Sequence, residues 1–192
     1  MSGMESFLII AGLSMEIFAS MECQGALVAK INKRQLVGIC LVVAAVQLAA
    51  LGLGYFPVHL YVANHAIGDG AILGRIIAVT IFMGIGIHLI VEAVRNERIM
   101  EHLVEKIPMG KTLGKIFFTS IYTILAGIAF GFLVTNVKTL LVMIGVVSAA
   151  FIVAGIYTGY HFGFEQKKKA YIIGGILLFL AGADVLVRML GG

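Results

Sequence analysis

Charged residues are scarce in this chain. Asp, Glu, Lys and Arg together make up 12% of its 192 residues, whereas a soluble domain carries about 25%. So few charges cannot cover a water-facing surface, and 60% of the sequence is hydrophobic. The composition therefore excludes a soluble protein, and the long unbroken apolar runs exclude the short alternating segments of a membrane β-barrel. What fits is an all-α, polytopic membrane protein.

Proline and cysteine are also rare. The chain holds two Pro against 24 Gly, a balance that suits helices packing closely in lipid. Its two cysteines, Cys23 and Cys40, fall in or near apolar runs, which argues against a disulfide framework or a zinc cluster. The sequence also lacks a nucleophile–base pair, a phosphate-binding loop and a haem site. We therefore expect neither an enzyme nor a resident cofactor.

The apolar runs give the number of membrane spans. A helix needs about 20 apolar residues to cross the hydrocarbon core, and six runs meet that length: Met4–Ala29, Leu36–Val58, Ala71–Val94, Leu113–Val134, Thr139–Phe162 and Ala170–Leu190. The first run lacks a basic n-region and a small-residue cleavage site, so we expect it to be retained. Glycines in the later runs are expected to permit close helix contact: Gly84, Gly86, Gly145, Gly155, Gly174, Gly175 and Gly182.

Basic residues concentrate in alternate loops. Eleven of the 14 Lys and Arg follow the first, third or fifth run: Lys30, Lys33, Arg34, Arg95, Arg98, Lys106, Lys111, Lys115, Lys167, Lys168 and Lys169. The positive-inside rule places these loops in the cytoplasm and both termini outside the bacterial inner membrane. Because this bias accounts for the net charge of +4, the charge does not indicate nucleic-acid binding.

One loop, between the third and fourth runs, is longer than a tight turn. Its apolar stripe predicts a short amphipathic helix on the cytoplasmic surface or an extension of the third span: Ile99, Met100, Leu103, Val104 and Ile107. The chain then divides into a first three-helix repeat (residues 1–95), a linker (96–112) and a second three-helix repeat (113–192).

Weak similarities relate the two halves. The matching stretches are Leu13–Ile17 with Thr119–Thr123, and Gly86–Glu92 with Gly182–Arg188. Because each half has three runs, the second half would enter the membrane from the opposite side. Such inverted repeats are typical of secondary transporters, whose substrate lies near the midplane between the halves.

Two polar residues interrupt the first two runs. An ionisable group inside a bilayer costs about 2.5–3.5 kcal/mol, so Glu16 needs an explanation. It is either a cation ligand or proton acceptor, with Ser20 on the same helical face, or a protonated Glu bonded to a neighbouring helix. Gln47 can offer its carbonyl oxygen to an ion or to another helix. Glu22, on a different face of the first helix, could line an inner vestibule or reach the interface.

The third and sixth runs each carry an i, i+4 pair. His88 and Glu92 project from one helical face, and this ligand set suits Mn²⁺, Fe²⁺ or Zn²⁺. Alternatively, Glu92 forms an ion pair with Arg95. Asp184 and Arg188 are expected to form an ion pair at the outer interface.

Three further segments carry a family resemblance. Gly12–Ala19, Thr119–Gly127 and Lys167–Gly175 are similar to S-M-D-A-F-A, T-S-[IL]-D-A-[LM]-A-V-G and G-K-K-A-E-x-[IL]-G-G of the bacterial manganese efflux pump family, in the lysine-exporter superfamily. The resemblance extends over all six runs. It implies a six-helix inner-membrane fold and the export of Mn²⁺.

The departures from the family pattern concern charge. Glu16 stands where the family has Asp and keeps the carboxylate. Tyr122 stands where the family has a second Asp and removes a charge, and Gln24 replaces a Lys. A hard divalent cation needs several oxygen ligands and compensating negative charge. Either another acid, such as Glu92, substitutes for the missing one, or the substrate has changed.

The sequence thus predicts a secondary transporter that exports a cation, with Glu16 as central ligand or proton carrier. Ser20, Gln47, Thr119 and Tyr122 would supply neutral oxygens around it. The alternative is a transport-inactive family member that serves as a membrane interaction or assembly subunit. Position 122 discriminates between them, because a Mn²⁺ transporter is expected to suffer from the missing acid. The expected partners are the lipid bilayer and the cation, and a homo-oligomer is compatible with the sequence.

Overall fold

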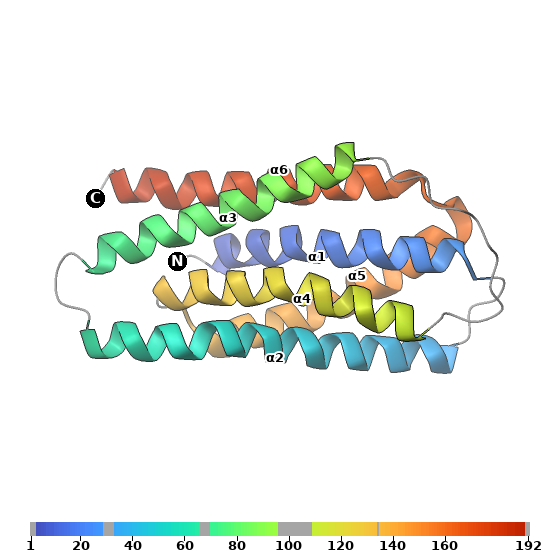
Figure 1. Cartoon of the computed structure of the whole chain (residues 1–192), viewed down its shortest axis with the longest axis horizontal. Coiled ribbons are helices and arrows are strands. Elements are labelled where there is room, and N and C mark those ends of the chain that lie inside the picture. The colour runs from blue at the N-terminus through green and yellow to red at the C-terminus, as the bar shows by residue number, and fades with distance from the viewer. Residues whose placement is uncertain (1–2, 29–32, 66–69, 96–108, 134, 191–192) are drawn as a thin grey trace.

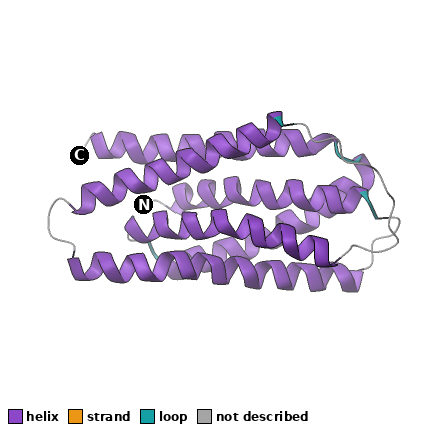
Figure 2. Ribbon diagram, viewed as in Figure 1, coloured by secondary structure: helices purple, strands orange, loops and turns teal. Residues whose placement is uncertain are grey.

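The computed structural model describes residues 3–28, 33–65, 70–95, 109–133 and 135–190. These residues form six helices: α1 (Gly3–Ala26), α2 (Lys33–His65), α3 (Gly70–Val94), α4 (Met109–Phe132), α5 (Val137–Phe162) and α6 (Glu165–Leu190). The helices run along the long axis of one bundle (Figures 1 and 2). Each predicted span corresponds to one helix, so the predicted helical membrane fold is confirmed.

Five of these helices contain an apolar stretch long enough to cross a membrane, namely α1, α2, α3, α5 and α6. In α4 the apolar stretch found among the described residues, Thr119–Phe132, is shorter. The helix predicted over residues 99–107 lies outside the described residues.

The second helix differs most from its prediction. It continues through Pro57 to His65 and has 33 residues, whereas the sequence predicts an end at Val58. A helix of this length measures about 50 Å and exceeds a hydrocarbon core of about 30 Å. Because α2 is longer than the core is thick, part of it extends beyond the membrane core. Pro57 does not prevent this, since a proline removes one backbone hydrogen bond without necessarily ending a helix.

The first helix is the most enclosed. In its apolar stretch 78% of the residues are buried, against 33% to 44% in the other four spans. It packs chiefly against α5 and α6, while α4 packs chiefly against α2 and α3. If the halves are repeats, α1 corresponds to α4, α2 to α5 and α3 to α6. Under this correspondence the neighbours of α1, which are α5 and α6, match the neighbours of α4, which are α2 and α3. The inverted repeat stays a prediction, and this pattern of neighbours supports it.

Close contact between helices depends on glycine at several points. A Cβ added at Gly25 or Gly159 would overlap the backbone between α1 and α5, and one added at Gly54 would do so between α2 and α4. The seven glycines named from the sequence divide into two groups. An added Cβ would lie within 3.3 Å of a neighbouring helix at five of them: Gly86, Gly155, Gly174, Gly175 and Gly182.

At the other two glycines the prediction is wrong. A Cβ added at Gly84 or Gly145 would meet nothing within 4 Å. Sequence position alone does not tell which face of a helix meets a neighbour.

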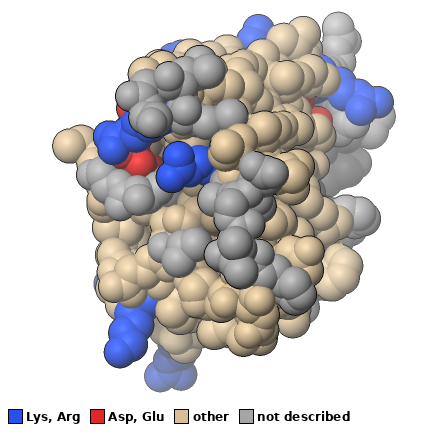
Figure 3. All heavy atoms as spheres, turned by 90° about the vertical axis from the view of Figure 1, so that its left-hand side faces the viewer, with Lys and Arg blue, Asp and Glu red and all other residues tan. Residues whose placement is uncertain are grey.

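Both chain ends lie at the same end of the bundle (Figure 1). Figure 3 looks onto this end, where a few basic and fewer acidic side chains interrupt a surface of other residues. Shared placement of the termini agrees with an even number of spans. Which side of the membrane this end faces stays a prediction from the basic loops.

Candidate functional site

Glu16 lies in the middle of α1, the most enclosed helix. Its side chain is 8% exposed, and the neighbouring Leu13 and Ile17 on the same helix belong to the hydrophobic core. A carboxyl group in this position has left water and the lipid headgroups, and only other protein groups can compensate its charge. The groups around it therefore decide what Glu16 can do.

His88 and Glu92 project from the same face of α3, as their spacing requires. The Nε2 atom of His88 lies 2.6 Å from the hydroxyl of Tyr122 on α4, and the two rings stack with their centroids 4.9 Å apart. This hydrogen-bonded pair joins α3 of the first predicted repeat to α4 of the second. His88 itself is exposed.

The carboxyl group of Glu92 approaches that of Glu16 closely enough for the two to interact electrostatically. The phenol of Tyr122 interacts with both carboxyl groups. The sequence places Glu92 near the cytoplasmic end of its span. In the structure α3 packs against α6 and α4, and its last turn carries Glu92 within electrostatic reach of Glu16. No ion pair joins Glu92 to Arg95 in the described part of the chain.

A second tyrosine completes this group. Tyr171 on α6 is 8% exposed, and its phenol interacts electrostatically with Glu16, Glu92 and Tyr122. Tyr171 is not among the site residues predicted from the sequence. The available signal was the resemblance itself, because Tyr171 stands where the family pattern G-K-K-A-E has its acid. We call Glu16, His88, Glu92, Tyr122 and Tyr171 the central cluster.

The central cluster combines oxygen ligands with an imidazole nitrogen. Two ionised carboxylates carry the charge that neutralises a divalent cation, and phenol, carboxylate and imidazole together suit a metal such as Mn²⁺. Among the described residues, however, no three His, Cys, Asp or Glu side chains lie close enough together to hold a metal ion. The structure brings the carboxyl groups of Glu16 and Glu92 near each other, but the described side chains do not form a complete set of metal ligands.

The other predicted ligands occupy different positions. Ser20, buried on α1, follows Glu16 by about one helical turn, and the half-buried Thr119 precedes Tyr122 by about one turn. Gln47 lies between α2 and α4, where its Oε1 accepts a hydrogen bond from the hydroxyl of Thr123. This bond agrees with the helix-to-helix alternative for Gln47. A ligand role for these residues stays a prediction.

The burial of Glu22 argues against a place in an open vestibule, and its position relative to the interface stays a prediction. Its side chain is fully buried, and its Oε1 accepts a hydrogen bond of 2.8 Å from the backbone N–H of Gln166. Gln166 is in the first turn of α6, where backbone N–H groups lack partners within the helix and the helix dipole favours negative charge. Glu22 therefore caps α6 from another helix, and its burial has a structural explanation.

The ion pair predicted between Asp184 and Arg188 forms near the C-terminal end of α6. Arg188 Nε lies 3.2 Å from an Asp184 carboxylate oxygen. A second contact, of 2.7 Å, joins Arg188 Nη2 to Glu5 Oε1 at the start of α1. The pair of Asp184 and Arg188 is thus confirmed, and its extension to Glu5 ties the first and last helices together near the chain ends.

Comparisons with known proteins agree along the whole chain. A family model described as "Putative manganese efflux pump" matches residues 30–186. A protein of Acetivibrio thermocellus named "Putative manganese efflux pump MntP" is 29% identical over 196 residues, which cover 100% of this chain and 93% of that protein. A protein of the same name from Xanthomonas campestris pv. campestris is 26% identical over 197 residues, with 100% and 99% covered. No solved structure matches the chain.

Proposed function

Because the chain belongs to the putative manganese efflux pump family, we propose that it is a secondary transporter that exports a divalent cation, Mn²⁺ first of all, from the bacterial cytoplasm. It is a multi-pass membrane protein, and five of its described helices are long and apolar enough to cross the bilayer. The relatives named as manganese efflux pumps cover it from end to end.

One observation carries the proposal: the carboxyl group of Glu16 is buried in the middle of the most enclosed helix, and Glu92 is the acid within its electrostatic reach. Two like charges in a low-dielectric interior repel each other strongly. A divalent cation between them would turn that repulsion into attraction. Glu92 would thereby supply the second charge that the family places at the position of Tyr122, which favours substitution by another acid over a changed substrate.

The phenols and His88 would complete the ligand set. Tyr122 and His88 are hydrogen-bonded to each other, so the Nε2 atom of His88 is not available to a cation while that bond is made. Transport requires the halves of such a protein to move relative to each other. We suggest that this movement separates α3 from α4, breaks the bond, and turns the Tyr122 oxygen and the His88 nitrogen towards the ion. Protons compete with the cation for the same carboxylates, which would couple export to proton uptake.

Mn²⁺ flux into liposomes containing the purified protein tests this function. We expect the native protein to transport Mn²⁺ and Glu92→Gln to reduce the flux by about 10- to 100-fold, the range measured for perturbed metal sites. Glu165→Gln is the matched control, since Glu165 is an exposed acid at the start of α6. Absence of Mn²⁺ flux through correctly inserted native protein would contradict the proposal. Equal flux in Glu92→Gln would remove Glu92 from the site.

The direction of export depends on the orientation in the membrane, which we also propose: basic loops in the cytoplasm and both termini outside. Single cysteines at Lys138 and Lys168 test it, because Lys138 lies at the start of α5 and Lys168 lies near the start of α6, which follows the other end of α5. A membrane-impermeant thiol reagent added to intact cells is expected to label Lys138→Cys and to leave Lys168→Cys unlabelled. The reverse labelling would invert the topology.

A further inference from the structure

A groove of about 400 Å³ lies beside α1, between α5 and α6. It is distinct from the central cluster, none of whose residues lines it. The aromatic rings of Phe18 on α1 and Phe151 on α5 meet edge to face in this groove, with centroids 6.3 Å apart. Its volume falls within the range of about 300–1,000 Å³ that is usual for pockets that bind small molecules.

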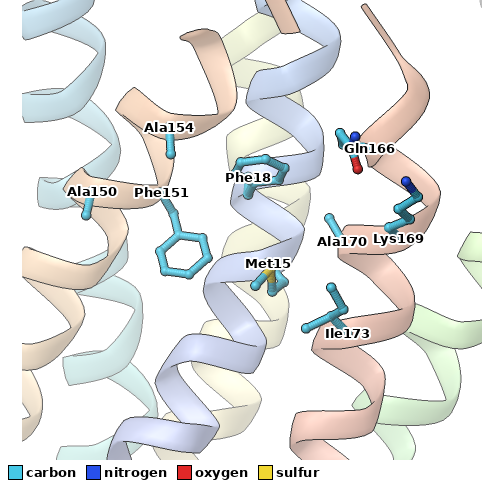
Figure 4. Close-up of a pocket in the computed structure, with 9 residues that line it drawn as sticks. All are labelled: Met15, Phe18, Ala150, Phe151, Ala154, Gln166, Lys169, Ala170 and Ile173. Atoms are coloured by element: carbon cyan, nitrogen blue, oxygen red, sulfur yellow. The ribbon is translucent and has the colours of Figure 1, made fainter. Parts of the chain in front are cut away.

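The groove exists because of how three helices pack. α1 contacts both α5 and α6 extensively, whereas α5 and α6 contact each other only sparsely. The small side chain of Ala154 on α5 leaves the space between them open. Figure 4 shows Phe18 and Phe151 in that space, with Ile173 on the α6 side.

The two ends of the groove differ in polarity. Gln166 and Lys169 line it near the start of α6, and Ile173 lines it farther along the same helix (Figure 4). Lys169 is exposed and follows two further lysines, Lys167 and Lys168. The groove therefore has a cationic end at the membrane surface and an apolar remainder within the membrane core. Among the described residues no carboxylate lines it, so a metal cation would find no compensating charge there.

We propose that this groove binds an anionic phospholipid. The phosphate group lies at Lys169 and Gln166, and one acyl chain lies against Phe18, Phe151 and Ile173. Basic side chains near a membrane surface attract anionic headgroups, and each buried methylene of a chain adds about 0.8 kcal/mol of binding free energy. The basic end of the groove thus matches the phosphate group of a phospholipid, and the apolar remainder matches its acyl chain.

Native mass spectrometry of the full-length, delipidated protein tests the proposal. The probes are phosphatidylglycerol and phosphatidylcholine with identical acyl chains, and we expect the anionic lipid to bind more tightly. Lys169→Gln should weaken phosphatidylglycerol binding by about fivefold, the effect of one basic residue at the membrane surface. Lys168→Gln is the matched control, since Lys168 is exposed in the same run and does not line the groove.

A second variant tests the acyl chain separately. Ala154→Trp fills the groove without changing any charge, and we expect it to weaken phosphatidylglycerol binding by about tenfold or more, the loss of two or so buried methylenes. Soluble glycerol phosphate, the headgroup without chains, should not bind measurably. Equal losses in Lys168→Gln and Lys169→Gln would overturn the proposal. So would tight binding of glycerol phosphate, or native lipid affinity in a folded Ala154→Trp.

Discussion

Glu16 and Glu22 are two buried acids on the same helix, and they meet different surroundings. Glu22 accepts a hydrogen bond from the first turn of α6, where the helix dipole already favours a negative charge. Glu16 instead lies near a second carboxyl group, that of Glu92. One acid finds its compensation inside the fold, whereas the other has a neighbour of like charge.

This difference shows that burial of an acid does not by itself indicate function. Both carboxyl groups have left water, and both are costly on that account. What separates them is whether the protein supplies the compensating positive charge or dipole. A site for a transported cation must leave that compensation to the cation, and the surroundings of Glu16 do so.

The largest effect is expected from neutralising Glu16. Glu16→Gln removes one of two charges that would hold the cation, so Mn²⁺ flux in liposomes should fall by about 100-fold. The thermal unfolding temperature should change little, since Gln keeps the size and one acceptor oxygen of the buried side chain. Native flux in Glu16→Gln would show that the carboxylate only joins helices.

The matched change at Glu22 should have the opposite effect. Glu22→Gln keeps one acceptor oxygen for the Gln166 N–H but loses the interaction of a charge with the α6 dipole. We expect the free energy of unfolding to fall by about 1–2 kcal/mol, measured by thermal denaturation in detergent. Mn²⁺ flux per folded molecule should change little. A transport defect at native stability would assign Glu22 to the cation path and would contradict the distinction between Glu16 and Glu22.

A smaller effect is expected at Tyr122. Tyr122→Phe keeps the aromatic ring beside His88 and removes the hydroxyl that bonds to Nε2. One neutral hydrogen-bonding group is worth about 1 kcal/mol, so Mn²⁺ affinity measured by calorimetry should fall about fivefold. The companion variant Tyr122→Asp adds a third carboxylate and should bind Mn²⁺ more tightly than the native protein. Unchanged affinity in both variants would remove Tyr122 from the ligand set.

The smallest effect concerns Arg188. Its side chain is 62% exposed while it contacts Glu5 and Asp184. Exposed ion pairs contribute about 0.2–1 kcal/mol, so Arg188→Gln should lower the unfolding temperature slightly and leave Mn²⁺ flux unchanged. A loss of flux at native stability would give this end of the bundle a part in gating.

Much of the fold follows from the sequence because the constraint is local. A bilayer demands an unbroken apolar helix of fixed length, and each of the six predicted spans contains most of its helix. The cost of a membrane-embedded acid singles out Glu16 for the same reason. The end of α2 was missed because the apolar run marks only the span, whereas the helix continues beyond Val58 to His65.

The site was harder to predict because it depends on distant partners. The bond that explains Glu22 joins residues separated by 144 positions in the sequence. The approach of Glu92 to Glu16 depends on how α3 packs against α6 and α4, which helical periodicity does not determine. Tyr171 was missed because a tyrosine in an apolar run carries no charge, so its place in the membrane has no large energetic cost that calls for an explanation.

A double-mutant cycle on Mn²⁺ binding tests the central claim, that Glu16 and Glu92 hold one cation together. Calorimetry would compare the native protein with Glu16→Gln, Glu92→Gln and the double variant. Each single change should weaken binding by about tenfold or more, and the double variant should lose much less than the product of the two losses, since partners at one site are coupled. Native affinity in Glu92→Gln, or losses that multiply independently, would show that the two carboxylates do not share a cation.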